Sequence, residues 1–309
     1  MRRAGETMSR LTDLEDYIHR EASELEGTIG IAIKSLETGE QILLNADMIF
    51  PTASVFKIPV LVELYKQVGE GKLGLDDIVQ VTNYSKIDGS GVLKELHSGL
   101  EVTVHDLATL MIIVSDNTAT DLILDLIGID NINRTLAEIG LTKTKVFMST
   151  RDLIFDIVGL GKLEPEKRLI HVARESIQRY SIDLSAKSLG DEGNDVSTPF
   201  EMMALLEKIF RAQILDQRAC EGMLNILKRC QHFNAIPLFL PEGKAIVAHK
   251  TGNLPGIRND VGIIYPQDDS PPFIVTALTR RLRRGVDGDM AIARISKAAF
   301  EMFTGEKSP

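Results

Sequence analysis

A serine and a lysine three residues apart, Ser54 and Lys57, are residue types that can do chemistry together. They lie in residues 50–59, just before the apolar run 60–65. Residues three apart on a helix share a face, so the hydroxyl and the amine can meet if a helix begins here. A lysine whose pKa is lowered by burial or by another cation can take the serine proton. The pair therefore suggests nucleophilic attack on a carbonyl, with the free N–H groups of the helix start available to a developing oxyanion.

Each residue of this pair also has a purely structural interpretation. Ser54 could serve as the N-cap of the helix, a position that serine favours. Lys57 could lie on the surface with its stem over apolar neighbours. Phe56, Ile58 and Pro59 flank Lys57, however, and such apolar neighbours are unfavourable for a solvated amine.

Two further motifs follow in the chain, Ser115-Asp116-Asn117 and Lys250-Thr251-Gly252. The first stands where one expected helix breaks before another, so the Ser115 hydroxyl can point into a cleft. We interpret Asp116 as structural, holding the bend between the helices. The alternatives are a plain helix-to-helix turn for the first motif and a strand end with a turn for the second.

The three motifs in this order resemble the β-lactamase and penicillin-binding protein superfamily, and class A β-lactamases most closely. The resemblance covers about residues 27–303 and includes Thr198-Pro199 before a helix and Asn259-Asp260 at the start of a strand. It implies a serine hydrolase of the class A β-lactamase type that forms an acyl-enzyme on a β-lactam or a related amide or ester.

The resemblance also implies roles for individual residues. Ser54 would attack the carbonyl carbon, and Lys57 would take its proton or hold the network that does. Ser115 would relay a proton to the leaving nitrogen, and Lys250 would keep that relay polarised and attract an anionic substrate. The backbone N–H groups of Ser54 and Asn253 would form the oxyanion hole.

Four residues are expected to bind the substrate. Asn117 can offer an amide donor and acceptor to a substrate's side-chain amide. Thr251 and Gly252 belong to the strand motif beside it. Arg258 matches a position that class A enzymes use for the substrate carboxylate, with an ordinary surface arginine as the alternative.

The loop before Thr198-Pro199 departs from the family's pattern. Class A enzymes carry a Glu-x-x-Leu-Asn sequence there, and its glutamate activates the water that removes the acyl group. If Leu184 matches the leucine of that pattern, Ser181 replaces the glutamate and Ser185 replaces the asparagine. Asp183 is then the nearest carboxylate.

Other carboxylates lie further upstream, at Glu164, Glu166 and Glu175, in a segment that looks like an insertion. Asp195 matches the position of the aspartate that anchors this loop in the family. Without the glutamate, acylation can survive while deacylation becomes slow. A penicillin-binding DD-peptidase-like or esterase-like enzyme therefore stays open, as does a β-lactam sensor or trap that remains acylated.

The order of the expected elements predicts an α+β fold of the β-lactamase/transpeptidase type. Helical periodicity or caps indicate helices at 10–26, 54–69, 103–118, 119–127, 131–140, 200–229 and 287–303. Strands are expected at 28–36, 41–45, 244–252, 260–265 and 272–279. Residues 72–100 and 185–197 read as turn-rich or loop, and residues 150–180 are mixed in character. Strands from both chain ends must therefore share one antiparallel sheet, with helices beside it.

This plan predicts one catalytic unit at residues 27–306, preceded by a leader and helix at 1–26. Within the unit, residues 27–50 and 240–306 would form the α/β part and residues 51–239 a mainly helical lobe. The active site would lie between the two.

Composition limits the classes of partner. The 309 residues are 44% hydrophobic and 26% charged, which is ordinary for a globular protein, and the formal net charge is −9. That charge argues against a nucleic-acid partner. The two cysteines, Cys220 and Cys230, have no metal-binding or redox spacing and are interpreted as core or surface thiols. We expect no metal and no organic cofactor, and a small-molecule substrate.

Arg2 and Arg3 follow the first residue, but no apolar segment comes after them, so the sequence shows no signal peptide. No run is long enough to span a membrane. The protein is then either cytoplasmic or exported with a leader that has been removed. The sequence does not indicate an oligomeric state.

Overall fold

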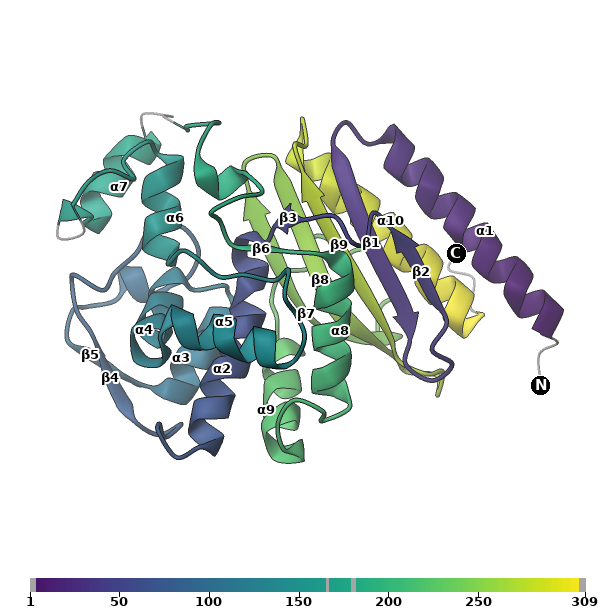
Figure 1. Cartoon of the computed structure of the whole chain (residues 1–309), viewed down its shortest axis with the longest axis horizontal. Coiled ribbons are helices and arrows are strands. Elements are labelled where there is room, and N and C mark those ends of the chain that lie inside the picture. The colour runs from purple at the N-terminus through teal and green to yellow at the C-terminus, as the bar shows by residue number, and fades with distance from the viewer. Residues whose placement is uncertain (1–3, 165–166, 179–181, 306–309) are drawn as a thin grey trace.

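A five-stranded antiparallel sheet forms the centre of the computed structural model, which describes residues 4–164, 167–178 and 182–305 (Figure 1). The strand order is β2-β1-β9-β8-β7. The first two strands come from the N-terminal part, β1 (Thr28–Ser35) and β2 (Gln41–Leu44). The others come from the C-terminal part, β7 (Ala245–Leu254), β8 (Ile257–Pro266) and β9 (Phe273–Arg280). The predicted α+β fold with one sheet from both chain ends is confirmed.

Two long helices, α1 (Ala4–Glu24) and α10 (Gly285–Thr304), cover one face of this sheet and lie side by side (Figure 1). Alternate residues of β1, among them Ile31 and Ile33, are buried in the same apolar cluster as Ile18 of α1 and Phe300 of α10. Alternation along a strand sends successive side chains to opposite faces, so β1 presents an apolar face to these helices.

The other face of the sheet packs against the helical part of the molecule. Its apolar cluster joins Ala32, Val261 and Ile263 of the sheet to α2 (Lys57–Gly69) and α8 (Pro199–Phe210). The helices α3 (Val104–Ile113), α4 (Asn117–Ile127), α5 (Ile129–Glu138) and α9 (Gln217–Leu227) contribute to the same cluster. The two faces of the sheet therefore belong to two separate cores, and the motif residues lie on the side of the helical one.

Side-chain caps begin several of these helices where the sequence predicts them. Thr103 accepts a hydrogen bond from Asp106 N at 3.0 Å, and Thr198 accepts one from Glu201 N at 3.1 Å. Pro199 takes the first position of α8, where its missing N–H costs nothing. The predicted starts of α3 and α8 are confirmed.

The prediction of one helix from Phe200 to about Arg229 is wrong. The segment forms α8 and α9, separated by residues 211–216. Ala212 has φ 50° in the connection, and Asp216 caps α9 by accepting from Ala219 N at 2.8 Å. The apolar periodicity continues across this break because both helices bury the same kind of face.

The segments expected to be irregular contain regular structure. The turn-rich segment 72–100 contains β4 (Ile78–Val81), which pairs with β5 (Leu100–Thr103) at its end. The mixed segment 150–180 contains α6 (Thr150–Ile157) and α7 (Ile170–Gln178). Short strands β3 (Phe50–Pro51) and β6 (Val196–Ser197) pair with each other beside the nucleophile stretch. No helix among the described residues has the length and apolar run needed to cross a membrane.

Candidate active site

Ser54 lies in a single 3-10 turn, η1 (Ala53–Phe56), that leads directly into α2. Its neighbours from Pro51 to Val60 are all buried, and Ser54 alone in that stretch is partly exposed. The turn follows Thr52, and its N-cap makes no side-chain hydrogen bond. Phe56 caps α2, so the interpretation of Ser54 as an N-cap is wrong. The arrangement leaves the Ser54 hydroxyl as the reachable group of a stretch that is otherwise held in the core.

Lys57 begins α2 and is completely buried, at 0% exposure. Its amine donates to Ser115 O at 2.7 Å, to Ser115 Oγ at 3.2 Å and to Asn117 Oδ1 at 2.9 Å. The surface interpretation of this lysine is therefore wrong. Among the described contacts, no hydrogen bond joins the amine to Ser54 Oγ. The amine bridges from the nucleophile's helix to the Ser115-Asp116-Asn117 motif.

Burial holds the pKa of the Lys57 amine well below its usual value, and the nearby Lys250 ammonium lowers it further. Asp116 and Asp121 oppose this shift, but they do not reverse it. All of the amine's partners in the described structure are neutral oxygens. A lysine in this setting can exist as a free amine and accept a proton.

The Ser115-Asp116-Asn117 motif is held in an unusual backbone conformation. Ser115 has φ 55°, a left-handed value that few non-glycine residues adopt. Asp116 caps α4 through Ala119 N at 2.9 Å and also accepts from Val92 N and Leu93 N. The carboxylate therefore locks the bend between α3 and α4 to the loop before it, which agrees with the structural role we assigned to it.

Asn117 uses both ends of its amide inside the protein. Its oxygen accepts from Lys57, and its nitrogen donates to Asp88 O at 2.9 Å. Asn117 N also donates to Ser90 O at 3.1 Å. The loop around residues 87–93, which the sequence analysis did not single out, is thus tied to the motif by its backbone. A substrate amide at Asn117 would share or replace these contacts.

The third motif occupies the edge strand β7. Lys250 is completely buried, and its amine donates to Thr251 O at 2.8 Å. Burial lowers the pKa of this amine to about 8, while Cys230 and Asp260 act in the opposite direction. The ammonium form of Lys250 is thus close to its point of deprotonation at neutral to mildly alkaline pH.

Close approach fixes β7 against the Ser54 turn. A Cβ on Gly252 would stand 2.4 Å from Thr52 O, so only glycine fits there. Asn259 of β8 donates to Pro51 O at 2.8 Å and to Thr52 O at 3.0 Å. These contacts bring the backbones of Ser54 and Asn253, the two expected oxyanion donors, onto adjoining segments. Asn253 itself is exposed.

Arg258 pairs with Asn253 across β7 and β8 and points to the face of the sheet covered by α10. Its guanidinium donates to Leu254 O at 2.9 Å and to Ile257 O at 2.8 Å, and its Nε lies 3.4 Å from Asp289 Oδ2. The side chain is about one quarter exposed, at 28%. Arg258 therefore braces the β7–β8 turn, and its expected contact with a substrate carboxylate stays a prediction.

Backbone hydrogen bonds join the two ends of the segment that runs from residue 146 to residue 195. Lys145 and Val196 exchange backbone hydrogen bonds at 2.9 and 3.0 Å. Asp195 Oδ1 accepts from Phe147 N at 2.7 Å and from Met148 N at 2.9 Å. Burial raises the pKa of Asp195 to about 7 despite these hydrogen bonds. The aspartate thus pins the two ends of the segment through backbone N–H groups.

Carboxylates near the expected glutamate position show no base-like environment in the described residues. Asp183 is exposed, and its Oδ1 accepts from Ser185 N and Ser185 Oγ, hydrogen bonds that lower its pKa. Glu164 and Glu175 are exposed. Ser181 and Glu166 lie outside the described residues. No group of three or more His, Cys, Asp or Glu side chains in the described parts of the chain could hold a metal ion.

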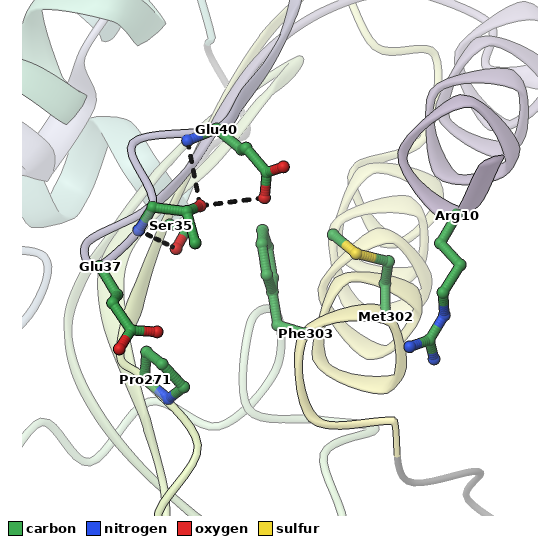
Figure 2. Close-up of a pocket in the computed structure, with 8 residues that line it drawn as sticks. Arg10, Ser35, Glu37, Glu40, Pro271, Met302 and Phe303 are labelled. Carbon is green, nitrogen blue, oxygen red and sulfur yellow. Dashed lines mark hydrogen bonds between the residues drawn. The ribbon is translucent and has the colours of Figure 1, made fainter. Parts of the chain in front are cut away.

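A pocket of about 380 Å³ lies away from these motifs, between the β1–β2 turn and the end of α10 (Figure 2). Arg10, Glu37, Glu40 and Phe303 are among its lining residues. Thr38 Oγ1 donates to Glu40 at 2.9 Å inside it. No motif residue lines this pocket, so it is separate from the candidate active site.

A family model described as "Beta-lactamase enzyme family" matches residues 13–303, and the chain belongs to that family. Beta-lactamase OXY-2 of Klebsiella oxytoca is 26% identical over 293 residues, covering 93% of this chain and 89% of the relative. Beta-lactamase L2 of Stenotrophomonas maltophilia is 26% identical over 274 residues, covering 88% and 79%. The class that fold and family define is a hydrolase of the β-lactamase kind.

Solved structures agree with this assignment. A beta-lactamase from Sphaerobacter thermophilus superposes with a TM-score of 0.78 at 28% identity, covering 96% of this chain and 99% of the other. PBP-A has the same fold, with a TM-score of 0.78 at 24% identity and coverage of 96% and 97%. The likeness to class A β-lactamases that the motifs predicted is confirmed at the level of fold and family.

Proposed function

We propose that this protein is a serine hydrolase of the class A β-lactamase type, in which Ser54 is acylated by a β-lactam or a related amide or ester. One observation carries the proposal: the buried Lys57 amine, three residues from the partly exposed Ser54, bonds directly to Ser115. The proposed base and proton relay are thus hydrogen-bonded to each other, and the proposed nucleophile lies three residues from the base in the chain.

Acylation begins with the free amine of Lys57. It takes the Ser54 proton as Oγ attacks the carbonyl carbon, and the carbonyl electrons move to the oxygen. The oxyanion then lies against the backbone N–H groups of Ser54 and Asn253, each worth about 3 kcal/mol in such sites. The low pKa of Lys57 supports this role because an ammonium could not accept the proton.

The tetrahedral intermediate collapses when its carbon–nitrogen bond breaks and the leaving nitrogen needs a proton. Ser115 Oγ supplies it and is re-protonated from Lys57, which donates to that oxygen at 3.2 Å. Lys250 keeps its ammonium near this relay and attracts an anionic substrate. Thr251, Gly252, Asn117 and Arg258 complete the proposed substrate contacts.

Deacylation is the step for which the chain offers the fewest candidate catalytic groups. The aligned position carries Ser181 rather than a glutamate, and Asp183 is exposed with a lowered pKa. A general base typically contributes about 10² to 10⁴ in rate. We therefore expect the acyl-enzyme to form faster than it is hydrolysed.

The same feature supports a second candidate, a binding protein that stays acylated and acts as a β-lactam sensor or trap. A DD-peptidase-like or esterase-like enzyme is the third possibility, because the acylation apparatus would serve a peptide or an ester equally well.

Intact-mass spectrometry during incubation with benzylpenicillin separates these candidates. An adduct that appears and then disappears means turnover, and a persistent adduct means a binder. Absence of any adduct while the benzylpenicillin stays intact would reject acylation by penicillins and leave peptides or esters as substrates. Absence of an adduct while the penicillin is consumed would mean that deacylation is faster than acylation.

A further inference from the structure

A groove of about 610 Å³ lies between the last turns of α2 and the first turns of α9. His105 borders it from the start of α3, and Leu75 and Asp76 border it from the loop after α2. The three helices contact one another, and α2 and α9 lie side by side (Figure 1). We call this feature the α2–α9 groove.

The groove is separate from the candidate active site. Among the described residues, those of the three motifs do not contribute to its lining. Tyr65, which does line it, follows Lys57 by eight positions on α2, and a helix rises about 12 Å over that length. A ligand in the groove would therefore not occupy the space beside Ser54.

Tyr65 is the buried polar side chain of the groove. It is 6% exposed, and the hydrogen bonds within the described part of the chain do not include its hydroxyl. The hydroxyl end of the ring lies against Gly222 of α9, because a Cβ added there would stand 2.9 Å from Tyr65 Cε1 and 3.0 Å from the hydroxyl oxygen. Buried tyrosine hydroxyls usually have a partner. This one is available to a ligand in the groove.

The protonation state of Tyr65 defines what its hydroxyl can bind. Burial raises the pKa of Tyr65 above its usual value, although the charge of Arg229 acts in the opposite direction. The side chain is therefore a neutral phenol at physiological pH. Its oxygen can accept a hydrogen bond from an ammonium group, and the face of its ring attracts cations.

The inner wall of the groove is apolar. Val68, Leu75 and Ala219 line it and pack against the same apolar cluster to which Tyr65 belongs. Gly222 adds a stretch of helix surface without a side chain. Binding sites for small molecules combine such a wall with a few polar groups. A ligand that fits this wall has an apolar body.

The rim of the groove carries more negative than positive charge. Three exposed carboxylates line it, those of Asp76, Asp216 and Glu221, against one exposed guanidinium, that of Arg218. Asp216 accepts from a backbone N–H and Glu221 from a glutamine amide, so neither charge is neutralised by these bonds. Even with Arg229 counted, the carboxylates outnumber the guanidinium groups. This balance favours a cation, whereas the two lysines of the proposed active site favour an anion.

We propose that the α2–α9 groove is a second binding site of this protein, which takes a small organic cation made of an apolar ring or chain and a primary ammonium group. The ammonium group donates to the hydroxyl oxygen of Tyr65, and the apolar body lies on Val68, Leu75 and Ala219. The rim carboxylates add attraction through solvent. Binding makes or breaks no covalent bond, and the inference does not depend on the proposed function.

Three probes with the same ring and different charge test the class of ligand. The full chain is titrated in a calorimeter with 2-phenylethylamine, an ammonium ion at pH 7, with 2-phenylethanol, which is neutral, and with phenylacetate, an anion. We expect saturable binding of one molecule of 2-phenylethylamine. The alcohol should bind about threefold to tenfold more weakly, because it lacks the charge-assisted hydrogen bond, and phenylacetate more weakly still.

Variants of the groove test the location. Tyr65→Phe removes only the hydroxyl and should weaken the binding of 2-phenylethylamine by about tenfold. Gly222→Ala places a methyl group against the Tyr65 ring and should also weaken it, while alanine favours the helix. Tyr265→Phe is the matched control, since the Tyr265 hydroxyl is also buried without a partner in the described structure but lies outside the groove. This variant should bind as the wild-type protein does.

A rim variant tests the role of charge. Asp76→Asn should weaken the binding of 2-phenylethylamine by about twofold to fivefold and leave the binding of 2-phenylethanol unchanged, because an exposed carboxylate acts only on the charged probe. Added salt should weaken the binding of the ammonium probe in the wild-type protein and do so less in Asp76→Asn.

Three results would overturn the proposal: no saturable binding of 2-phenylethylamine, equal affinity for the three probes, or unchanged affinity in Tyr65→Phe with its fold verified by circular dichroism. Failure of the proposed function looks different. These titrations contain no substrate of the active site, so a protein that forms no adduct with benzylpenicillin can still bind the ammonium probe. A protein that ignores the probe can still be acylated.

Discussion

Among the residues that the structure describes, the two lysines Lys57 and Lys250 are completely buried, and their surroundings differ. Lys57 stands on the helical side with three neutral oxygen partners, and its pKa is held well below the usual value by burial and by Lys250. Lys250 stands on the edge of the sheet with one carbonyl partner, and burial brings its pKa only to about 8 because Cys230 and Asp260 oppose the shift.

The difference shows how one site can hold a base and a cation made from the same side chain. Desolvation lowers the pKa of both amines and nearby acidic groups oppose it at both, but only the pKa of Lys57 is lowered further by another lysine, Lys250. The Lys250 ammonium lowers the pKa of Lys57 by like-charge repulsion and so favours a neutral Lys57 amine. The comparison therefore predicts that the two residues are not interchangeable.

The largest effect is expected from Ser54→Ala, which removes the hydroxyl of the proposed nucleophile. The adduct with benzylpenicillin should disappear, and turnover should fall by up to about 10⁶, as for other residues that act as a catalytic unit. Intact-mass spectrometry and steady-state rates measure both, and circular dichroism verifies the fold. Full activity in this variant would remove Ser54 from the mechanism.

Exchanging lysine for arginine tests the comparison directly. Lys57→Arg keeps the charge but cannot supply a free amine, so acylation should slow by about 10² to 10⁴, the usual contribution of a general base. Lys250→Arg keeps the positive charge that we propose for that position, so the rate of acylation should fall far less. Lys66→Arg, on the same helix with its amine partly exposed, is the control. Equal losses in Lys57→Arg and Lys250→Arg would contradict the division of roles.

A carboxylate added to the loop separates acylation from deacylation. We expect a burst followed by slow turnover in the wild-type protein, and faster turnover by about 10² in Ser181→Glu, since a general base contributes at least that much. Ser185→Glu places the same charge in the same loop and should have no such effect. Rapid wild-type hydrolysis without a burst would mean that Asp183, Glu175 or Lys57 already activates the water, and substitution of each would show which.

The smallest effect concerns pH. Lys57 must lose its proton to act, so acylation rises with pH through its lowered pKa. Lys250 must keep its proton, so acylation of an anionic substrate falls above pH about 8, by about tenfold per pH unit once the ammonium is lost. A bell-shaped profile with a penicillin, and a weaker alkaline fall with an uncharged ester, is expected. An alkaline fall of equal size with both substrates would assign it to another group.

Much of the fold and of the candidate site could be predicted from the local sequence. Three short motifs, their order and the elements around them predicted the α+β architecture and the family, and the caps Thr103 and Thr198 marked helix starts that the structure contains. These features depend on neighbouring residues, so they can be read along the chain. The absence of a glutamate at the aligned position of the loop was equally visible, because it is a matter of residue type.

Contacts between distant segments were decided only by tertiary structure. Asp216 begins a second helix, α9, inside the apolar periodicity that predicted one helix, because a turn and a cap interrupt the backbone without changing the buried face. The amine of Lys57 reaches Ser115 rather than Ser54, since the 3-10 turn and the left-handed backbone of Ser115 set their relative positions. His249 was one residue of an expected strand until folding placed its ring 2.9 Å from the buried carboxylate of Asp260. A residue's type is local, but its charge state depends on every element that removes water or adds a charge around it.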